Sequence, residues 1–496
     1  MLALALCVPF LFGGWVWDDH VLLESARPGG WLSLWTEPIT PVTAGPGSSY
    51  YRPFALSVMT LLSTLGGPFA IHLAAGVLHA ISTHLLWKLL RASGAGASAV
   101  PLAMIFAAHP VATEVLGWAS ALPDALSTAL SLGALWACRT SKTGPFLALA
   151  LLALLSKESA IAFVCVAPWV AAESKPERYD RSTLKAAVGL LVIWAAVRIE
   201  IAGVSGPSAV FYASSFMEAP LELASLLIWP WPITATRDAW LMGPTHLTIG
   251  LAALAAILIY SRKTGRVHWF VAMTGLILLA TPIVAQSHFV ADRYVYPAVG
   301  CAILSLASLE MPKRVNHFLT ALCGVLVVTT HIPRAADWRD DNALFQSATK
   351  AQPTSAYSWH LLGVVKLHQS AYSEAASAFK RALELEHPLA EDSELLLVAL
   401  VEAGDYPEAV AWIENNHQIY VTARYLAYAA KSFLHTGNVA AAASNVDSLR
   451  LSNGSYDGPE WVDALADEIH QASQKNNEDP ALTTEPTRSE LPPATP

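Results

Sequence analysis

The sequence predicts an all-α protein in two parts, a polytopic bundle of membrane helices followed by a soluble α-solenoid. The 496 residues are 54% hydrophobic and 14% charged, whereas ordinary globular domains carry about 25% charged residues. Nearly all of the apolar excess lies in residues 1–333, in blocks of the ~17–25 residues that cross a bilayer. Residues 334–496 have the composition of a water-soluble protein.

We expect about eleven spans, since a helix needs ~20 apolar residues to cross the hydrocarbon core. They are predicted at 1–16, 69–90, 97–113, 119–138, 144–156, 158–172, 184–202, 246–261, 267–285, 294–309 and 316–332. The fifth and sixth are short and are interpreted as broken helices that line a cavity. The apolar, proline-rich stretch 220–232 predicts a re-entrant or interfacial helix.

Basic residues predict the orientation of the bundle. Alternate loops are basic, with clusters at Lys88/Arg91, Arg139/Lys142, Lys175/Arg178/Arg181/Lys185, Arg262/Lys263/Arg266 and Lys313/Arg314. These loops are cytoplasmic by the positive-inside rule. The N-terminus is then cytoplasmic, and everything after residue 333 lies outside. The low-lysine, alanine-rich tail favours a bacterial inner membrane with a periplasmic C-terminal part.

Ionisable residues gather in the loops on the outer side of this predicted bundle. They are Asp18, Asp19, Arg52, His109, Glu114, Asp124, Lys157, Glu158, Arg237, Asp292 and Arg293. A transporter would be expected to place its ionisable groups near the midplane of its helices. The pattern therefore predicts a site at the outer membrane surface.

A helical repeat follows the membrane part. From Ala356, residues Trp359, Gly363, Ala375, Phe379 and Ala382 fall at the positions of a tetratricopeptide repeat, with Pro388 closing the unit. A second unit follows thirty-four residues later, with Tyr406 matching Tyr372, and a weaker third spans 424–451. We expect a connector at 334–354, repeats at 355–473 with a capping helix at 460–473, and a disordered polar tail at 474–496.

Composition excludes other classes of function. The net charge of −9 comes without a basic patch, so no nucleic-acid partner is predicted. Five cysteines lie in or beside apolar blocks without CxxC spacing, which argues against a disulfide framework and against a zinc site. His72 and His79 share one face of a predicted helix, where helix packing or hydrogen bonding explains them better than metal binding. No metal site is predicted.

Four short motifs resemble one family. The motifs WDD (17–19), HPVATE (109–114), LSKE (155–158) and DRYVYP (292–297) occur in this order. They resemble the transmembrane and tetratricopeptide-repeat O-mannosyltransferases, members of the GT-C superfamily of lipid-phosphosugar-dependent glycosyltransferases. The resemblance covers nearly all of residues 1–470 and also includes the repeat array after Trp338-Arg339-Asp340.

The resemblance implies a GT-C-like fold for residues 1–333 and a catalytic centre at Asp18 or Asp19. His109 and Glu114 would line the same cavity, and Lys157, Glu158 and Arg293 would lie near the lipid phosphate. The donor would be polyprenyl-phosphate mannose, and the acceptor a Ser or Thr of an exported protein recognised by the repeats. The chain departs from the family at 121–124, where a Gly-Arg cation is lost. Arg52 or Arg237 would compensate, or the donor differs.

The residue types fit this chemistry. Transfer from a polyprenyl phosphate needs a base for the acceptor hydroxyl and positive charge for the departing phosphate. An inverting single displacement needs one carboxylate base, for which we favour Asp18, with Asp19 orienting it. The polyprenyl-phosphate sugar is the donor substrate, no further cofactor is predicted, and a divalent metal is kept as an alternative.

Structural roles compete for each of these residues. The adjacent acids could cap the next helix, and Glu114 could cap the helix that starts beside it. His109 could be structural, Lys157 and Glu158 could pair at a helical corner, and Arg293 could pair with Asp292.

Two other functions also fit the organisation of the chain. A non-catalytic membrane anchor could carry an external repeat scaffold for envelope assembly. Alternatively, a ligase or transporter could move a preassembled lipid-linked oligosaccharide, which calls for a wider cavity than the short loops suggest.

Overall fold

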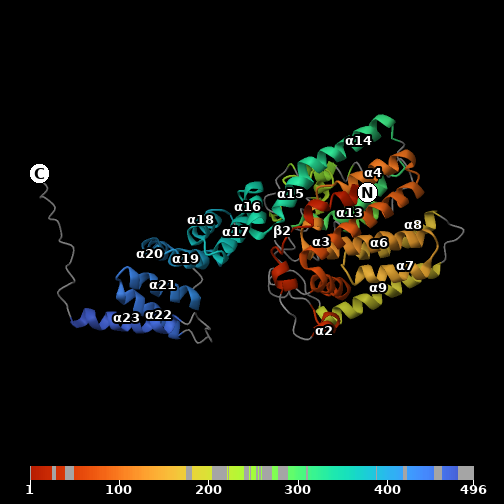
Figure 1. Ribbon diagram of the computed structural model, residues 1–496. Helices are drawn as coiled ribbons and strands as arrows, with labels where there is room; N and C mark the ends of the chain where they lie inside the picture. Colours follow the sequence, from red (N-terminus) through yellow and green to blue (C-terminus); the bar gives the residue numbers. More distant parts are fainter. Residues whose placement is uncertain are drawn as a thin grey trace, which may run out of the picture. The chain divides into compact units, whose positions relative to one another are not determined.

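The computed structural model divides the chain into two compact units, Met1–Ser355 and Ala356–Pro496. The structure describes residues 2–24, 30–38, 50–174, 181–203, 220–221, 223–238, 245, 247–252, 255, 259, 271–277, 289–308, 311–386, 388–416, 422–451 and 461–478. Helices dominate the described residues of both units (Figure 1). The predicted all-α class, a helical bundle followed by a helical repeat region, is confirmed.

The first unit is built from helices of very different lengths. In chain order they are α1 (Leu2–Ala5), η1 (Val8–Phe10), η2 (His20–Glu24), α2 (Gly30–Thr36), α3 (Pro53–Ala92), η4 (Gly96–Ser98), α4 (Ala99–Ala107), α5 (Ala112–Gly117), η5 (Ala119–Ala121), α6 (Leu122–Arg139), α7 (Thr143–Leu154), α8 (Ala160–Ser174), α9 (Arg181–Ala202), η8 (Asp292–Tyr294), α13 (Tyr296–Ser305), α14 (Lys313–Leu326), η9 (Val327–His331), α15 (Ile332–Asp337) and α16 (Asp341–Ala351).

Helix α6 forms the centre of this unit, packed against α3, α7 and α8. Its sequence is rich in Ala, Ser and Gly, whose small side chains let neighbouring backbones approach closely. Fourteen of its eighteen residues are buried. Outer helices present apolar side chains outward, as Val192 and Ile193 of α9 and Phe318 of α14 show. This reversal of the usual exposure is expected for a surface that faces lipid.

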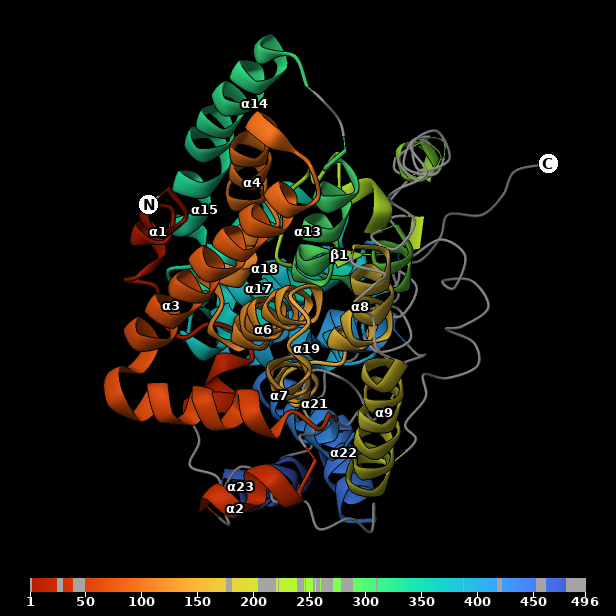
Figure 2. The same ribbon diagram turned by 90° about the vertical axis from the view of Figure 1, so that its right-hand side faces the viewer.

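Helix α3 is two helices joined at a sharp bend. Gly66 and Gly67 have non-helical backbone angles, with φ of Gly67 at +58°, and Pro68 follows directly. Glycine accepts a positive φ without steric cost, and proline cannot continue the hydrogen bonding of the preceding turn. The bend is visible in Figure 2. It places the start of α3, and with it Arg52, away from the line of the predicted span 69–90.

Three helical segments in the described part of the chain are long and apolar enough to cross a membrane: Pro53–Ala92, Ala119–Arg139 and Lys313–Asp337. Shorter apolar helices lie at Gly96–Ala107, Thr143–Leu154, Ala160–Ala172 and Tyr296–Ser305. The predicted spans 246–261 and 267–285 lie largely outside the described residues. The spans expected at 144–156 and 158–172 are short helices, as their sequences indicate.

Two predicted spans are wrong in detail. Residues 1–16 do not form one helix, because α1 ends at Ala5 and only a 3-10 turn follows at Val8–Phe10. The predicted span 97–113 stops at Ala107, and α5 begins at Ala112. His109-Pro110 lies between them, and proline lacks the N–H that a continuous helix would require.

A short antiparallel β pair joins two distant loops of the first unit. Strand β1 (Arg237–Asp238) pairs with β2 (Phe289–Val290), and Arg237 faces Val290 in register. The pairing brings Arg237 close to the turn that begins at Asp292.

The second unit is a series of helix hairpins. Helices α17 (Ala356–His368) and α18 (Tyr372–Leu383) form the first, α19 (Asp392–Glu402) and α20 (Tyr406–Asn415) the second, and α21 (Ala423–His435) and α22 (Val439–Leu451) the third. Helix α23 (Trp461–Glu478) packs against α22. Each hairpin contacts the next, which is the arrangement of a solenoid.

Two boundaries differ from those expected from the sequence. Residues 334–354 were predicted as a connector, yet α16 lies within them and belongs to the first unit. The tail was predicted to begin at residue 474, whereas α23 continues to Glu478. Residues 479–496 lie outside the described part of the chain.

Replacing Gly363 with alanine is expected to destabilise the second unit by about 1–3 kcal/mol. A Cβ at this position would lie 2.7–2.8 Å from three ring carbons of Phe379, which is fully buried. Helices α17 and α18 would have to separate. Thermal unfolding of the full-length protein measures the effect, with Ser377→Ala on the exposed side of α18 as the control. Equal unfolding temperatures for both variants would contradict this packing.

Candidate active site

The acid pair Asp18-Asp19 lies in a tight corner after the first short helices. Trp17 has a φ of +56°, a left-handed conformation that is uncommon for bulky residues and typical of functional sites. Asp19 is fully buried, whereas Asp18 is partly exposed. The corner therefore holds one acid inside the protein and leaves the other within reach of solvent.

Hydrogen bonds from Ser120 and Val16 fix Asp19. Its Oδ1 accepts the Ser120 N–H at 2.7 Å and also the Ser120 hydroxyl, and its Oδ2 accepts the Val16 N–H at 3.1 Å. Burial raises the pKa of Asp19 from its ordinary 3.8 to about 7, although these hydrogen bonds act against the rise. Asp19 thus attaches the corner to the loop between α5 and α6.

Trp118 connects this corner to the buried charges. Its ring stacks on Trp17, with centroids 5.0 Å apart and an interplanar angle of 12°. The guanidinium carbon of Arg293 lies 4.3 Å from the centre of the Trp118 ring, a cation–π contact. Arg293 also forms a short ion pair with Glu114, and its backbone N–H donates to the same carboxylate at 3.1 Å.

Tyr294 contacts two of the cations. Arg293 and Lys157 both approach its ring, at 4.7 and 5.1 Å from the centroid. The Lys157 ammonium pairs with Asp124 at the start of α6. Burial lowers the pKa of Lys157 to about 8, with the charges of Arg52 and Arg293 acting in the same direction and Asp124 against it. The three cations are therefore close enough to influence one another.

Two further ion pairs complete the cluster. Arg52, directly before α3, donates from Nε and Nη2 to one oxygen of Glu158, at 3.0 and 2.8 Å. Arg237 is fully buried and donates twice to Asp292, at 3.1 and 2.8 Å, and again to the Pro232 carbonyl. In each of the four pairs the partners come from separate loops or helix ends.

The structure brings most of the sequence-predicted residues into this one region. The cluster contains Arg52, Glu114, Lys157, Glu158 and Arg293, and Trp118 and Ser120 link it to Asp18 and Asp19. His109 is also buried, and its Nε2 lies 3.4 Å from the Leu227 carbonyl. This contact does not link His109 to the charged residues of the cluster.

Several alternatives considered for single residues are wrong. Lys157 and Glu158 do not pair with each other, since each binds a partner from another segment. Arg293 pairs with Glu114 and not with Asp292, which binds Arg237.

The contacts of His72 and His79 agree with the structural explanation given for them. His72 contacts the Leu116 carbonyl, and His79 contacts the Tyr296 hydroxyl.

Sequence reasoning missed the parts of the cluster that contact these residues. Asp124 was named among the outer ionisable residues and at the missing cation, but it was not assigned to the site. Trp118, Tyr294 and Tyr50, whose ring centre lies 4.3 Å from the Arg52 guanidinium carbon, were not assigned to it either. The signal for Tyr294 was its place beside Arg293 in the DRYVYP motif. Trp118 had no comparable signal, because a tryptophan near a membrane interface usually reflects the aromatic belt.

The cluster and the acid corner combine two kinds of chemical group. Asp18 is a partly exposed carboxylate, and the buried cations Arg293 and Lys157 are supported by aromatic rings. A guanidinium has five N–H groups, so Arg293 can keep Glu114 and still donate to an added phosphate. Among the residues that the structure describes, no group of three or more His, Cys, Asp or Glu side chains is arranged to hold a metal ion.

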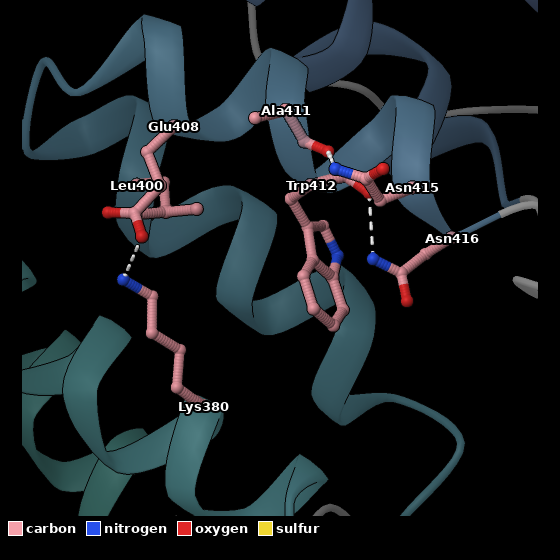
Figure 3. A pocket seen from close by; sticks show the side chains of 7 residues that line it. All are labelled: Lys380, Leu400, Glu408, Ala411, Trp412, Asn415 and Asn416. Carbon is pink, nitrogen blue, oxygen red and sulfur yellow. Dashed lines mark hydrogen bonds and ion pairs between the residues drawn. The ribbon is translucent and has the colours of Figure 1, made fainter.

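The second unit contains a separate pocket of about 310 Å³ between α18, α19 and α20. Its lining includes Trp412, Asn415 and Asn416, with the Lys380–Glu408 ion pair at its edge (Figure 3). The Trp412 Nε1 is buried without a hydrogen-bond partner. Both asparagines donate their side-chain amide N–H to backbone carbonyls of the preceding helical turn, at 2.8 and 2.9 Å.

Comparison with curated proteins finds a distant similarity to a mouse protein, "Protein O-mannosyl-transferase TMTC3" from Mus musculus. The two sequences are 24% identical over 426 residues, which is 70% of this chain and 45% of the mouse protein. The chain thus aligns with less than half of the length of this relative. No protein-family model matches the sequence, and no solved structure matches it.

Replacing Glu114 with glutamine is expected to destabilise the first unit by about 3–5 kcal/mol, because the buried Arg293 charge loses its counterion. The matched control is Arg339→Gln. Arg339 pairs with Asp340 at the surface, where its side chain is 69% exposed, so we expect a change of at most about 1 kcal/mol. Thermal unfolding in detergent compares the two. Similar losses for both variants would refute the buried pair.

The stability contributed by Asp19 is expected to fall as pH rises. Between pH about 4 and about 7 the folded protein keeps a proton on Asp19 that the unfolded chain has lost. The folded state therefore binds more protons, and raising the pH through this range disfavours it. The unfolding temperature of the wild type should fall relative to Asp19→Asn between pH 4 and 8. A difference that stays constant with pH would contradict the raised pKa.

Proposed function

We propose that the protein is a membrane glycosyltransferase that transfers one sugar, mannose, from a polyprenyl-phosphate donor to a hydroxyl acceptor. The observation that carries this proposal is the connection from Asp18-Asp19 through Trp118 to Arg293 and Lys157. It connects the corner that carries the partly exposed Asp18 to buried cations in one helical bundle. The distant similarity to a mouse O-mannosyl-transferase supports the same reaction.

In the proposed reaction, Asp18 acts as the general base. It takes the proton of the acceptor hydroxyl while that oxygen attacks the anomeric carbon of the sugar. The bond from this carbon to the phosphate oxygen breaks in the same step, so the configuration inverts. Asp19 is assigned the orienting role and not the role of base, because its own oxygens already accept hydrogen bonds from Val16 and Ser120. Its burial also leaves it less accessible than Asp18.

The departing lipid phosphate carries the negative charge that develops in this step. Arg293 and Lys157 would stabilise it, and Arg52 would add to the positive field. The three cations are already positioned by Glu114, Asp124 and Glu158. Such preorganised charges lose little energy to rearrangement during the reaction. The lipid tail would remain in the bilayer beside the bundle.

We propose that the acceptor is a Ser or Thr of an exported protein and that the second unit recognises it. The Trp412 pocket supports this role, because a buried indole N–H without a partner can donate to a bound peptide. Aromatic side chains often anchor such contacts. A site at the outer surface of a bacterial inner membrane, with a periplasmic repeat unit, fits the distribution of basic loops.

The decisive test uses purified full-length protein, radiolabelled polyprenyl-phosphate mannose and candidate acceptor peptides. Asp18→Asn should abolish transfer, because an amide cannot accept the hydroxyl proton. Asp447→Asn, an exposed acid on α22, should transfer like the wild type. Transfer by Asp18→Asn at the wild-type rate would remove Asp18 as the base. Absence of transfer by every variant with every sugar donor would favour a non-catalytic scaffold.

A further inference from the structure

The acid corner is held on both sides by one carboxylate from the far end of the first unit. Asp341 Oδ1 accepts the Trp17 N–H at 2.7 Å, and its Oδ2 contacts His20 Nε2 at 2.9 Å. These two contacts enclose Asp18 and Asp19 from the preceding and the following residue. Asp341 is the first residue of α16, more than 300 positions later in the chain.

The backbone at this corner requires such support. Trp17 is a bulky residue in the left-handed region, and it persists there only where the surroundings fix it. Its ring stacks on Trp118 and makes an edge contact with Phe345 of α16, with centroids 5.8 Å apart. Helix α16 therefore supplies both the hydrogen-bond acceptor and a ring contact for Trp17.

The residues just before α16 support the same region. Trp338 stacks on Trp118 at 6.2 Å and packs so closely on Gly117 that an added Cβ there would lie 2.4 Å from its ring. The Arg339 carbonyl accepts the Gly14 N–H at 3.0 Å. Trp118 is also the ring beneath Arg293. One segment thus contacts both the acid corner and the ring that carries the cation.

An acid at a helix start commonly stabilises the helix dipole. That role is already filled here by Asp340, whose side chain caps α16 by accepting the Ala343 N–H at 2.8 Å. Both oxygens of Asp341 are instead occupied by the acid corner. Its position is therefore explained by the corner better than by the helix.

We propose that Asp341 is a positioning residue for Asp18. By fixing the backbone of Trp17 and the side chain of His20, it sets the direction in which the Asp18 side chain points. The proposal rests on the proposed function, because Asp18 is the base of that reaction. It goes beyond it by making the segment after the last membrane helix part of the active site.

The test uses full-length protein carrying Asp341→Ala or Asp341→Asn, with Asp463→Ala as the control. Asp463 is an exposed acid in the first turn of α23, so it reproduces the loss of a helix-start acid without the corner. Three quantities are measured: kcat, the KM for polyprenyl-phosphate mannose, and amide hydrogen exchange across residues 15–22.

We expect Asp341→Ala to lower kcat about 10–100-fold with little change in KM, since a small misplacement of a reacting group has this effect. Exchange across residues 15–22 should rise in the same variant. Asp341→Asn should retain most of the activity and protection, because its amide oxygen can still accept the Trp17 N–H. The control should match the wild type in all three measurements.

Unchanged exchange in Asp341→Ala would overturn the proposal, and so would a wild-type kcat in a variant whose exchange has risen. A loss of activity in Asp463→Ala equal to that in Asp341→Ala would also overturn it. If the wild type transfers no sugar at all, the proposed function fails. The exchange measurement then still shows whether Asp341 fixes the corner.

Discussion

Buried ion pairs between distant segments organise the first unit. Arg52 binds Glu158, Lys157 binds Asp124, Arg293 binds Glu114 and Arg237 binds Asp292. Charges removed from water are costly unless they are paired. Each charged side chain is therefore bound to a partner from another segment of the chain, and the ion pairs hold these segments together. Short helices such as α5 and η8 gain a fixed position that their own few hydrogen bonds could not provide.

The same pairing explains how a cluster of cations can exist in an apolar bundle. Lys157 and Arg293 both contact the ring of Tyr294, and two like charges this close would repel each other if their carboxylate partners were absent. With the carboxylates present, the cluster is close to neutral and its members are held in place. An incoming phosphate would meet cations that are already oriented, with N–H groups to spare. The arrangement thus suits a ligand that carries its own negative charge.

The segment that supports the acid corner extends further along the chain than the membrane helices. Trp338, Asp341 and Phe345 contact the acid corner or the aromatic stack beside it. Gly117 provides the space for Trp338, because any side chain there would collide with the indole. Stacked rings and a buried glycine contact leave little freedom for adjustment. The geometry at Asp18 therefore depends on residues of the predicted membrane domain and on the segment that follows it.

The sequence by itself determined the class of the fold and most of the candidate site. Apolar blocks of membrane length predicted the helical bundle, and spaced small and aromatic residues predicted the hairpins around Gly363 and Phe379. Short motifs drew attention to Asp19, Glu114, Lys157 and Arg293, because ionised side chains in apolar segments need a reason to be there. These patterns involve residues that are close together in the sequence, so they can be recognised without the tertiary structure.

Only the tertiary structure decided which partner each charge takes. Pairing of Lys157 with Glu158 and of Arg293 with Asp292 was one alternative from the sequence, yet each of these residues binds a partner from another segment. Packing likewise decides the bend of α3, the left-handed backbone of Trp17 and the contact of Asp341 with the Trp17 N–H. The physical reason is that the cost of a buried charge depends on everything within a few ångströms of it. That neighbourhood is assembled from segments hundreds of residues apart.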